Sequence, residues 1–175
     1  FQKALDINPK LAVAANNPAS QDPQVIHSHD VDDLNHAVSG SDLELVQLKP
    51  GRLDATLSQV SVGDLSVDSG NVNQNIRVRG TLDPERYSLG MFRPGTRPTW
   101  NGNHLDSANA LLFEPGRELN GYTTTTYSWI SLVIPREWVS SICSTACSST
   151  MLRFGADCRV LRPDPMKLDD LWRSV

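Results

Sequence analysis

The chain has 175 residues, 39% of them hydrophobic, and a net charge of −4 at pH 7, so it is long enough to enclose one substantial core. Its basic residues are scattered and outnumbered by acidic ones, which argues against binding of a nucleic-acid backbone by this chain alone. No stretch is long and apolar enough to cross a bilayer, and the N-terminus lacks the basic and then apolar pattern of a signal peptide.

The number of cysteines bears on whether the protein is found in a reducing or an oxidising compartment. Cys143, Cys147 and Cys158 make an odd count, and the sequence contains no Asn-x-Ser/Thr glycosylation acceptor. Both features favour free thiols under reducing conditions. We therefore expect a cytoplasmic protein that does not associate with a membrane.

The N-terminal region predicts a flexible segment followed by a short helix. Residues 1–29 are rich in Asn, Pro, Ser, Gln and Asp near their middle, a composition typical of irregular structure. Ser28 or Asp30 can cap the helix that follows, because their side-chain oxygens accept hydrogen bonds from its free N–H groups. Gly40 is suited to end it.

Residues 43–70 alternate apolar and polar side chains with a period of two, as a strand with one buried face does. Pro50-Gly51 and Gly63-Asp64 interrupt the alternation with residues that favour tight turns. The stretch therefore predicts a meander of three successive strands. These strands are expected at residues 43–49, 53–62 and 65–69.

More short strands follow at nearly regular spacing. Asn101-Gly102 is a strong signal for a type I′ hairpin turn, and Asn120-Gly121 repeats it. So many short strands joined by tight turns predict an antiparallel β-barrel of the jelly-roll type, closed or nearly so, because an open sheet would leave long edges exposed. The further strands are expected at residues 76–82, 86–92, 108–113 and 127–134.

The pattern changes from strand to helix after residue 134. Pro135 suits the first position of a helix, and a second helical pattern runs through residues 166–175 to the end of the chain without a capping signal. We expect more protein to follow this second helix. The apolar faces of the two helices are candidates for a dimer interface formed by Trp138, Val139, Ile142, Leu168, Leu171 and Trp172.

A search for catalytic signatures finds no nucleophile elbow, no phosphate-binding glycine-rich loop and no dinucleotide fingerprint. His27 and His29 form a His-x-His pair, and with His104 they could bind a metal if all three converged. The pair lies before the first expected helix with no nearby glutamate, so exposed loop histidines are the favoured interpretation. We expect no enzyme activity, no bound metal and no cofactor.

Several aromatic residues lie on or beside the expected strands. Such residues, with a few polar groups among them, line small-molecule sites in binding barrels, although aromatic side chains in β proteins more often only fill the core. The candidate ligand-binding residues are Arg77, Tyr87, Phe92, Trp100 and Trp129.

The run from Val31 to Val139 contains the helix DVDDLNHAVSG, then QLKPGRL followed by the turn GDL, then NIRVRGTL, LLFEPGRELNG and WISLVIPREWV. This series resembles the N-terminal domain of AraC/XylS-type bacterial transcription regulators over about two thirds of the chain. The resemblance implies a cupin-like barrel that senses a small-molecule effector, followed by helices that mediate homodimerisation. It also implies that DNA is bound by a C-terminal helix-turn-helix domain that this chain lacks.

The expected organisation is therefore a flexible segment (1–29), a short helix with a cupin-like β-barrel (30–134) and a helical dimerisation and linker segment (135–175). The function expected is effector sensing and dimerisation in a transcription regulator. Two alternatives remain open at this point. One is a cupin-type metal-dependent enzyme, which requires the histidines to converge, and the other is an interaction module whose barrel is filled by side chains.

Overall fold

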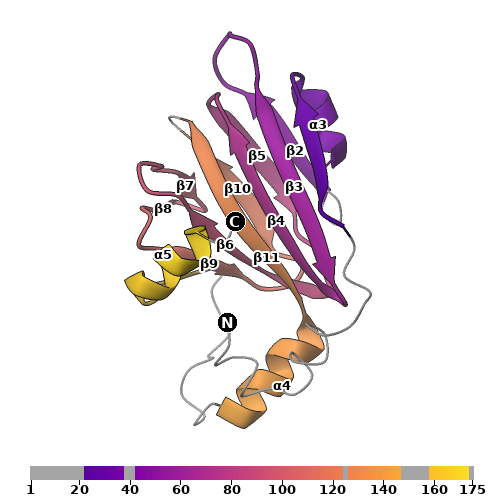
Figure 1. Cartoon of the computed structure of the whole chain (residues 1–175), viewed down its shortest axis with the longest axis vertical. Helices are drawn as coiled ribbons and strands as arrows, with labels where there is room; N and C mark the ends of the chain where they lie inside the picture. Colours follow the sequence, from indigo (N-terminus) through magenta and orange to yellow (C-terminus); the bar gives the residue numbers. More distant parts are fainter. Residues whose placement is uncertain (1–21, 38–41, 124–125, 147–157, 174–175) are drawn as a thin grey trace.

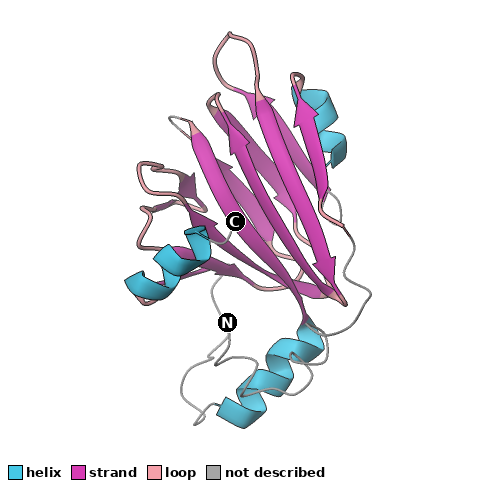
Figure 2. Ribbon diagram, viewed as in Figure 1, coloured by secondary structure: helices cyan, strands magenta, loops and turns pink. Residues whose placement is uncertain are grey.

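The computed structural model describes residues 22–37, 42–123, 126–146 and 158–173. Within these residues, a pair of antiparallel sheets face one another, with helices at their periphery (Figures 1 and 2). Sheet A has the strand order β1 (Gln24–Ser28), β3 (Ala55–Val62), β4 (Leu65–Val72), β11 (Tyr127–Pro135), β6 (Arg86–Phe92), β9 (Ala110–Phe113) and β12 (Cys158–Leu161). Sheet B has the order β2 (Asp42–Gln47), β5 (Ile76–Thr81), β10 (Glu118–Tyr122), β7 (Thr99–Trp100) and β8 (Asn103–His104).

The mainly β, antiparallel architecture is confirmed, but the closed barrel is wrong for the described residues. Strand pairing runs within each sheet and does not join one sheet to the other. The meander is also wrong in its first step, because β2 pairs with β5 in sheet B while β3 pairs with β4 in sheet A. Pro50-Gly51 therefore carries the chain from one sheet to the other instead of closing a hairpin.

Strand β1 lies inside the segment expected to be flexible, and that expectation is wrong for residues 24–28. β1 pairs with β3 along its whole length, with Ile26 opposite Leu57, and Ser28 is buried. The sequence did not indicate this strand because an edge strand can form with few apolar side chains when its neighbour supplies the hydrogen-bonding partners. The apolar alternation that predicts a strand is then weak.

The two Asn-Gly pairs adopt different structures. Asn101-Gly102 forms the predicted hairpin turn between β7 and β8, with φ of 45° and 78° at the two residues. Asn120-Gly121 does not turn but lies within β10. Gly121 is opposite Trp100, and a Cβ there would lie 2.0 Å from the indole ring, so the glycine makes room for the tryptophan.

Helix α3 (Val31–Ala37) is confirmed near its predicted position, and the backbone N–H of Asp32 donates to the Asp30 carboxylate at 2.9 Å, as expected for a capping residue. Leu34 is fully buried, and Asn35 exchanges hydrogen bonds with the backbone of Leu45 on β2. These contacts attach the helix to sheet B. Gly40 lies outside the described residues.

The two later helices are also confirmed. Helix α4 (Arg136–Ala146) continues directly from β11 and leads away from the two sheets, as Figure 1 shows. Helix α5 (Pro165–Arg173) lies against the outer face of sheet A, where Leu168 is buried with Met91, Ala110 and Ile130. Sheet A is thus covered on both faces, by sheet B on the inner face and by α5 over some of the outer one.

Candidate functional site

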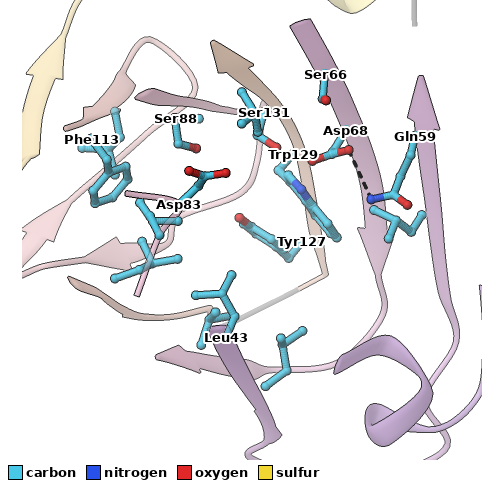
Figure 3. A pocket seen from close by; sticks show the side chains of 18 of the residues that line it. Leu43, Gln59, Ser66, Asp68, Asp83, Ser88, Phe113, Tyr127, Trp129 and Ser131 are labelled. Carbon is cyan, nitrogen blue, oxygen red and sulfur yellow. Dashed lines mark hydrogen bonds between the residues drawn. The ribbon is translucent and has the colours of Figure 1, made fainter. Parts of the chain in front are cut away.

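A cavity of about 510 Å³ lies between the two sheets, and side chains of both sheets line it (Figure 3). This volume is within the range of small-molecule binding sites. The strands turn alternate side chains inward, so each contributes every second residue to the cavity wall. A ligand here would be held between sheets and not on a surface loop.

One transverse row of sheet A crosses the middle of the cavity. Its members are directly opposite one another in the strand register, so they share the inward face. Five strands contribute polar or small residues to this row and the sixth a leucine. From β1 to β9 the row reads Gln24, Gln59, Asp68, Ser131, Gly90 and Leu111, and every member lines the cavity.

Four aromatic rings cluster beside this row. The Tyr127 ring is central: its centroid lies 5.9 Å from that of Phe92, 6.1 Å from that of Trp100 and 5.0 Å from that of Trp129. Phe92 and Trp100 stack at 6.4 Å. The rings come from both sheets, so they form a continuous apolar surface across the cavity, suited to a flat apolar group.

Glycines shape the space around these rings. Gly70 on β4 is opposite Trp129, and a Cβ on Gly70 would lie 2.3 Å from the indole, so the ring lies across β4 at this point. Gly90 differs, because a Cβ there would meet only the Phe92 ring, at 3.8 Å. The absence of a side chain at Gly90 therefore leaves space in the cavity.

Tyr127 is buried, and burial raises the pKa of its phenol well above the ordinary value, so the group stays neutral. Figure 3 shows its hydroxyl pointing into the cavity. No protein group within the described residues hydrogen-bonds this hydroxyl. It is therefore available to a ligand as a donor or an acceptor.

The charged side chains of the lining are unevenly matched. The Arg86 guanidinium lies 3.7 Å from the Asp83 carboxylate and also donates to the backbone oxygen of Asp64 at 3.1 Å. Asp68 instead accepts a hydrogen bond of 3.3 Å from the neutral amide of Gln59. Burial raises the pKa of Asp68 above its ordinary value, and this hydrogen bond opposes the effect only incompletely.

Three of the five predicted ligand-binding residues, Phe92, Trp100 and Trp129, line the cavity. The other two do not. Arg77 is exposed, because its neighbours on β5 take the inward positions. Tyr87 is buried but lies outside the lining, because strand alternation turns it away from the cavity-lining Ser88.

Sequence reasoning missed Asp68, Gln59, Ser131 and Tyr127. A usable signal was present in β11, where Tyr127, Trp129 and Ser131 are at alternate positions and must share a face. This signal was not recognised because the residues between these positions on β11 are about as apolar as the residues that line the cavity. The two faces of β11 could not be told apart from the sequence alone.

The proposed dimer residues divide between two settings. On α4, Trp138 and Val139 are half-buried, and the side chain of Ile142 lies outside the described residues. On α5, Leu168 is buried within the chain against sheet A, and Leu171 and Trp172 pack half-buried beside it.

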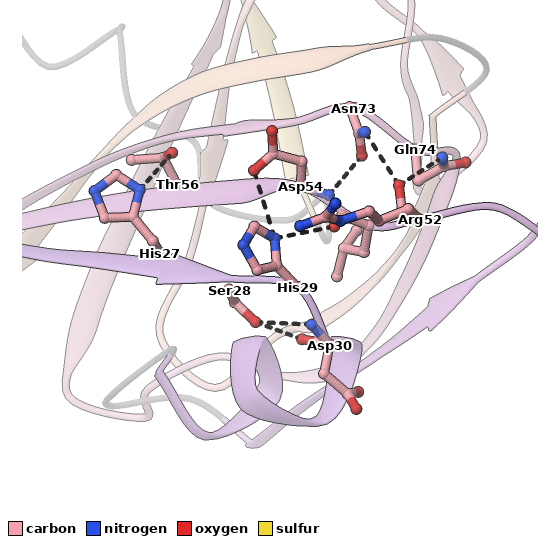
Figure 4. Close-up of polar contacts among 10 residues, drawn as sticks. His27, Ser28, His29, Asp30, Arg52, Asp54, Thr56, Asn73 and Gln74 are labelled. Carbon is pink, nitrogen blue, oxygen red and sulfur yellow. Dashed lines mark hydrogen bonds and ion pairs between the residues drawn. The ribbon is translucent and has the colours of Figure 1, made fainter.

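The histidines considered as metal ligands each contact a different neighbouring side chain. His27 Nδ1 lies 3.3 Å from the Thr56 hydroxyl, and His29 Nδ1 lies 3.7 Å from the Asp54 carboxylate (Figure 4). His104 contacts the Thr99 hydroxyl at 2.9 Å on sheet B. In the described ranges no three His, Cys, Asp or Glu side chains are grouped so that they could hold a metal ion.

No family model matches the chain, and no curated protein sequence matches it. Among solved structures, the AraC-like transcriptional activator CuxR is similar with a TM-score of 0.50 and 15% identity, over 69% of this chain and 51% of that one. The chain thus corresponds to about half of that structure. An RmlC-like cupin from Shewanella frigidimarina has a TM-score of 0.36 and 13% identity, over 55% of this chain and 87% of that one.

At this level of identity the likeness to CuxR concerns the fold. With its two facing antiparallel sheets, the chain has a fold similar to that of this AraC-like activator over the matched part. None of the described helices combines the length and apolarity needed to cross a membrane.

Proposed function

We propose that this chain is the effector-sensing and dimerisation domain of a bacterial transcription regulator of the AraC/XylS type. The cavity between the sheets is the observation that carries this proposal. It is of small-molecule size, aromatic on one side and polar along its middle row. The fold that encloses it is similar to that of an AraC-like transcriptional activator.

In this proposal the chain acts as a cytoplasmic homodimer, and DNA is contacted by a separate domain. The net charge of −4 supports DNA contact by a separate domain, because DNA binding requires clustered positive charge to replace the counterions of the phosphates. Helix α4 extends from the end of β11, a strand that lines the cavity, and so provides a physical connection between a bound effector and a dimer contact.

Two observations favour sensing over the alternatives. The described lining of the cavity contains neither histidine nor cysteine, so neither the histidine metal site nor a Ser-His or Cys-His catalytic pair has its residues there. An interaction module without a ligand would be expected to have its interior filled by side chains, whereas here the interior is open. We therefore propose a protein that binds its effector without turnover.

The proposal is tested by filling the cavity with Gly90→Val. Gly90 does not have a positive φ, and a Cβ there would meet only the Phe92 ring of the same strand, at 3.8 Å, so valine should be tolerated in β6 while it occupies ligand space. We expect compounds that raise the thermal stability of the native protein in a small-molecule screen to bind at least about tenfold more weakly to this variant.

The matched control is Thr81→Val, which introduces the same residue, valine, in place of another β-branched residue at an exposed position of β5, outside the cavity lining. It should bind every such compound as the native protein does. Native mass spectrometry of the unmodified chain would report a co-purified ligand and the oligomeric state together. Binding that survives Gly90→Val, or a broad screen without any ligand, would contradict effector sensing in this cavity.

A further inference from the structure

The class of ligand can be inferred from the charges around the cavity, on the basis of the function proposed above. Its lining includes the acidic residues Asp22, Asp68 and Asp83 but a single basic residue, Arg86. Arg86 lies nearest to Asp83. Asp68 has a neutral partner, Gln59, and no ion pair with a basic side chain among the described residues. The described wall therefore presents an unmatched negative charge toward a ligand.

The position of this charge relative to the aromatic rings is fixed by the strands. Asp68 and Gly70 are two residues apart on β4, both on the inward face, and the Trp129 indole covers Gly70. Successive inward positions on one strand are about 7 Å apart. The carboxylate and the ring surface are thus neighbours along the cavity wall, as the labelled side chains in Figure 3 show.

We propose that the cavity binds a small aromatic or flat apolar amine, with its ammonium group on the Asp68 carboxylate and its apolar portion against the rings of Tyr127 and Trp129. An ammonium group would form a charge-assisted hydrogen bond with the carboxylate, which is stronger than a neutral one. The adjacent aromatic faces add a favourable cation–π contribution. Ser131, opposite Asp68 in the register, can accept a second hydrogen bond from the same ammonium group.

Other ligand chemistries fit the cavity less well. An anionic ligand would face Asp68 and Asp83 with one arginine available, and that arginine is already engaged by Asp83 and by the Asp64 backbone. An uncharged polyol would leave the Asp68 carboxylate without a counter-charge in a partly dry environment, which costs free energy. The amine removes this cost because it neutralises the carboxylate.

The test measures binding of three indole compounds that share a ring and differ in charge. Tryptamine carries an ammonium group, tryptophol a neutral hydroxyl and indole-3-acetate a carboxylate. Isothermal titration calorimetry at pH 7 should show tryptamine binding at least about tenfold more tightly than tryptophol, the factor that corresponds to the lower end of a charged hydrogen bond. Indole-3-acetate should bind most weakly.

Asp68→Asn should reduce the preference for tryptamine over tryptophol to within about twofold, because the amide keeps the shape and loses the charge. Asp64→Asn is the matched control: it removes one exposed negative charge at the β3–β4 turn and should leave the preference unchanged. Tryptophol binding as tightly as tryptamine, or a preference that survives Asp68→Asn, would overturn the proposal.

The acid dependence provides a second test. Burial holds the Asp68 pKa above its ordinary value of 3.8, and a bound ammonium group would lower it again. Tryptamine affinity should therefore fall as pH falls toward that value, and the Asp68→Asn variant should lack this fall. Asp22, Asp83 and Arg86 also face the cavity, so the variant measured over the same pH range isolates the contribution of Asp68.

Failure of this inference is distinguishable from failure of the proposed function. One outcome is that neutral compounds bind as tightly as amines, with their binding weakened by Gly90→Val. In that case the cavity senses an effector and the amine inference is wrong. If none of the three indoles binds, the amine inference is also wrong, while the broader screen still decides whether the cavity binds an effector. Amine binding without any effect on dimerisation would support this inference and contradict the regulatory role.

Discussion

Asp68 shows how a single inward position can decide the chemistry of the cavity while remaining inconspicuous in the sequence. The alternation in residues 65–69 suggests that Leu65 and Val67 face the core and that the polar residues between them face solvent. The structure reverses this assignment, because Asp68 lines the cavity while Val67 packs on the outer face, in the apolar cluster that includes α5. A period of two identifies a strand but not which face is inward when both faces are covered.

The burial of Asp68 predicts a pH-dependent cost in stability. Because the pKa is raised in the folded state, the folded protein holds this proton more tightly than the unfolded chain does. The free energy of unfolding therefore decreases as pH rises through the raised pKa. Below the ordinary aspartate pKa of 3.8 the group is protonated in both states and this cost is absent.

Asp68→Asn should accordingly be more stable than the native protein at pH 7, on the order of 0.5 kcal/mol because solvent still screens the group to some extent, and equally stable at pH 3. Urea unfolding at both pH values measures the difference. Asp64→Asn, at an exposed position, should change stability at neither pH. An Asp68→Asn variant that is less stable than the native protein at pH 7 would contradict this account of the carboxylate.

At the level of elements, most strands and helices could be predicted from the sequence, but their partners could not. Strand β6 occurs at its predicted residues, and β11 extends one residue beyond its predicted end. The allocation of β2 to sheet B depends on pairing with β5, some 30 residues later, and a local turn signal such as Pro50-Gly51 carries no information about such a distant partner. For the same reason the sequence could not show that β1 and β12 extend the edges of sheet A.

Helix α5 combines predictable and unpredictable features. Its apolar spacing predicts a helix, and the same spacing makes that face a candidate dimer contact. The structure places Leu168 against Met91, Ala110 and Ile130 of sheet A within the same chain. An amphipathic pattern shows that a helix buries one face, and it does not show whether the partner belongs to the same chain.

Packing of α5 on sheet A predicts a large difference between two substitutions in the same helix. Leu168→Ala should lower the free energy of unfolding by about 2–3 kcal/mol, because it removes buried methyl groups and leaves a cavity. Met166→Ala should change it by less than about 0.5 kcal/mol, because Met166 is 78% exposed. Guanidinium chloride unfolding of both variants provides the measurement, and equal effects would mean that α5 does not contribute its face to the core.

At the level of the whole molecule, the sequence predicted an antiparallel β-barrel with candidate ligand-binding residues on its strands, whereas the structure has two facing sheets with the cavity between them. The aromatic residues Phe92, Trp100 and Trp129 were predictable because large rings beside strands must be buried somewhere. The open space among them was not predictable. It depends on Gly90, Ser131 and their neighbours meeting in one row, which only the register of five strands brings about.

The proposed homodimer is best tested at α4, whose first turns carry the half-buried Trp138 and Val139 away from the sheets. Tryptophan is among the residues that contribute most to the stability of protein interfaces, and a glutamate in its place would place a charge in a dry contact. We expect the native chain to sediment as a dimer at micromolar concentration. Trp138→Glu should raise the dissociation constant of the dimer at least about tenfold, which corresponds to a loss of about 1.4 kcal/mol in the free energy of association.

Glu137→Gln is the matched control, because it alters the exposed neighbouring position on the same helix and should leave the dimer intact. Sedimentation velocity over a range of concentrations distinguishes the three proteins, and circular dichroism checks that each retains its fold. A native chain that stays monomeric at every concentration would contradict dimerisation by this chain. A dimer that Trp138→Glu leaves unaffected would show that the interface lies elsewhere than on the first turns of α4.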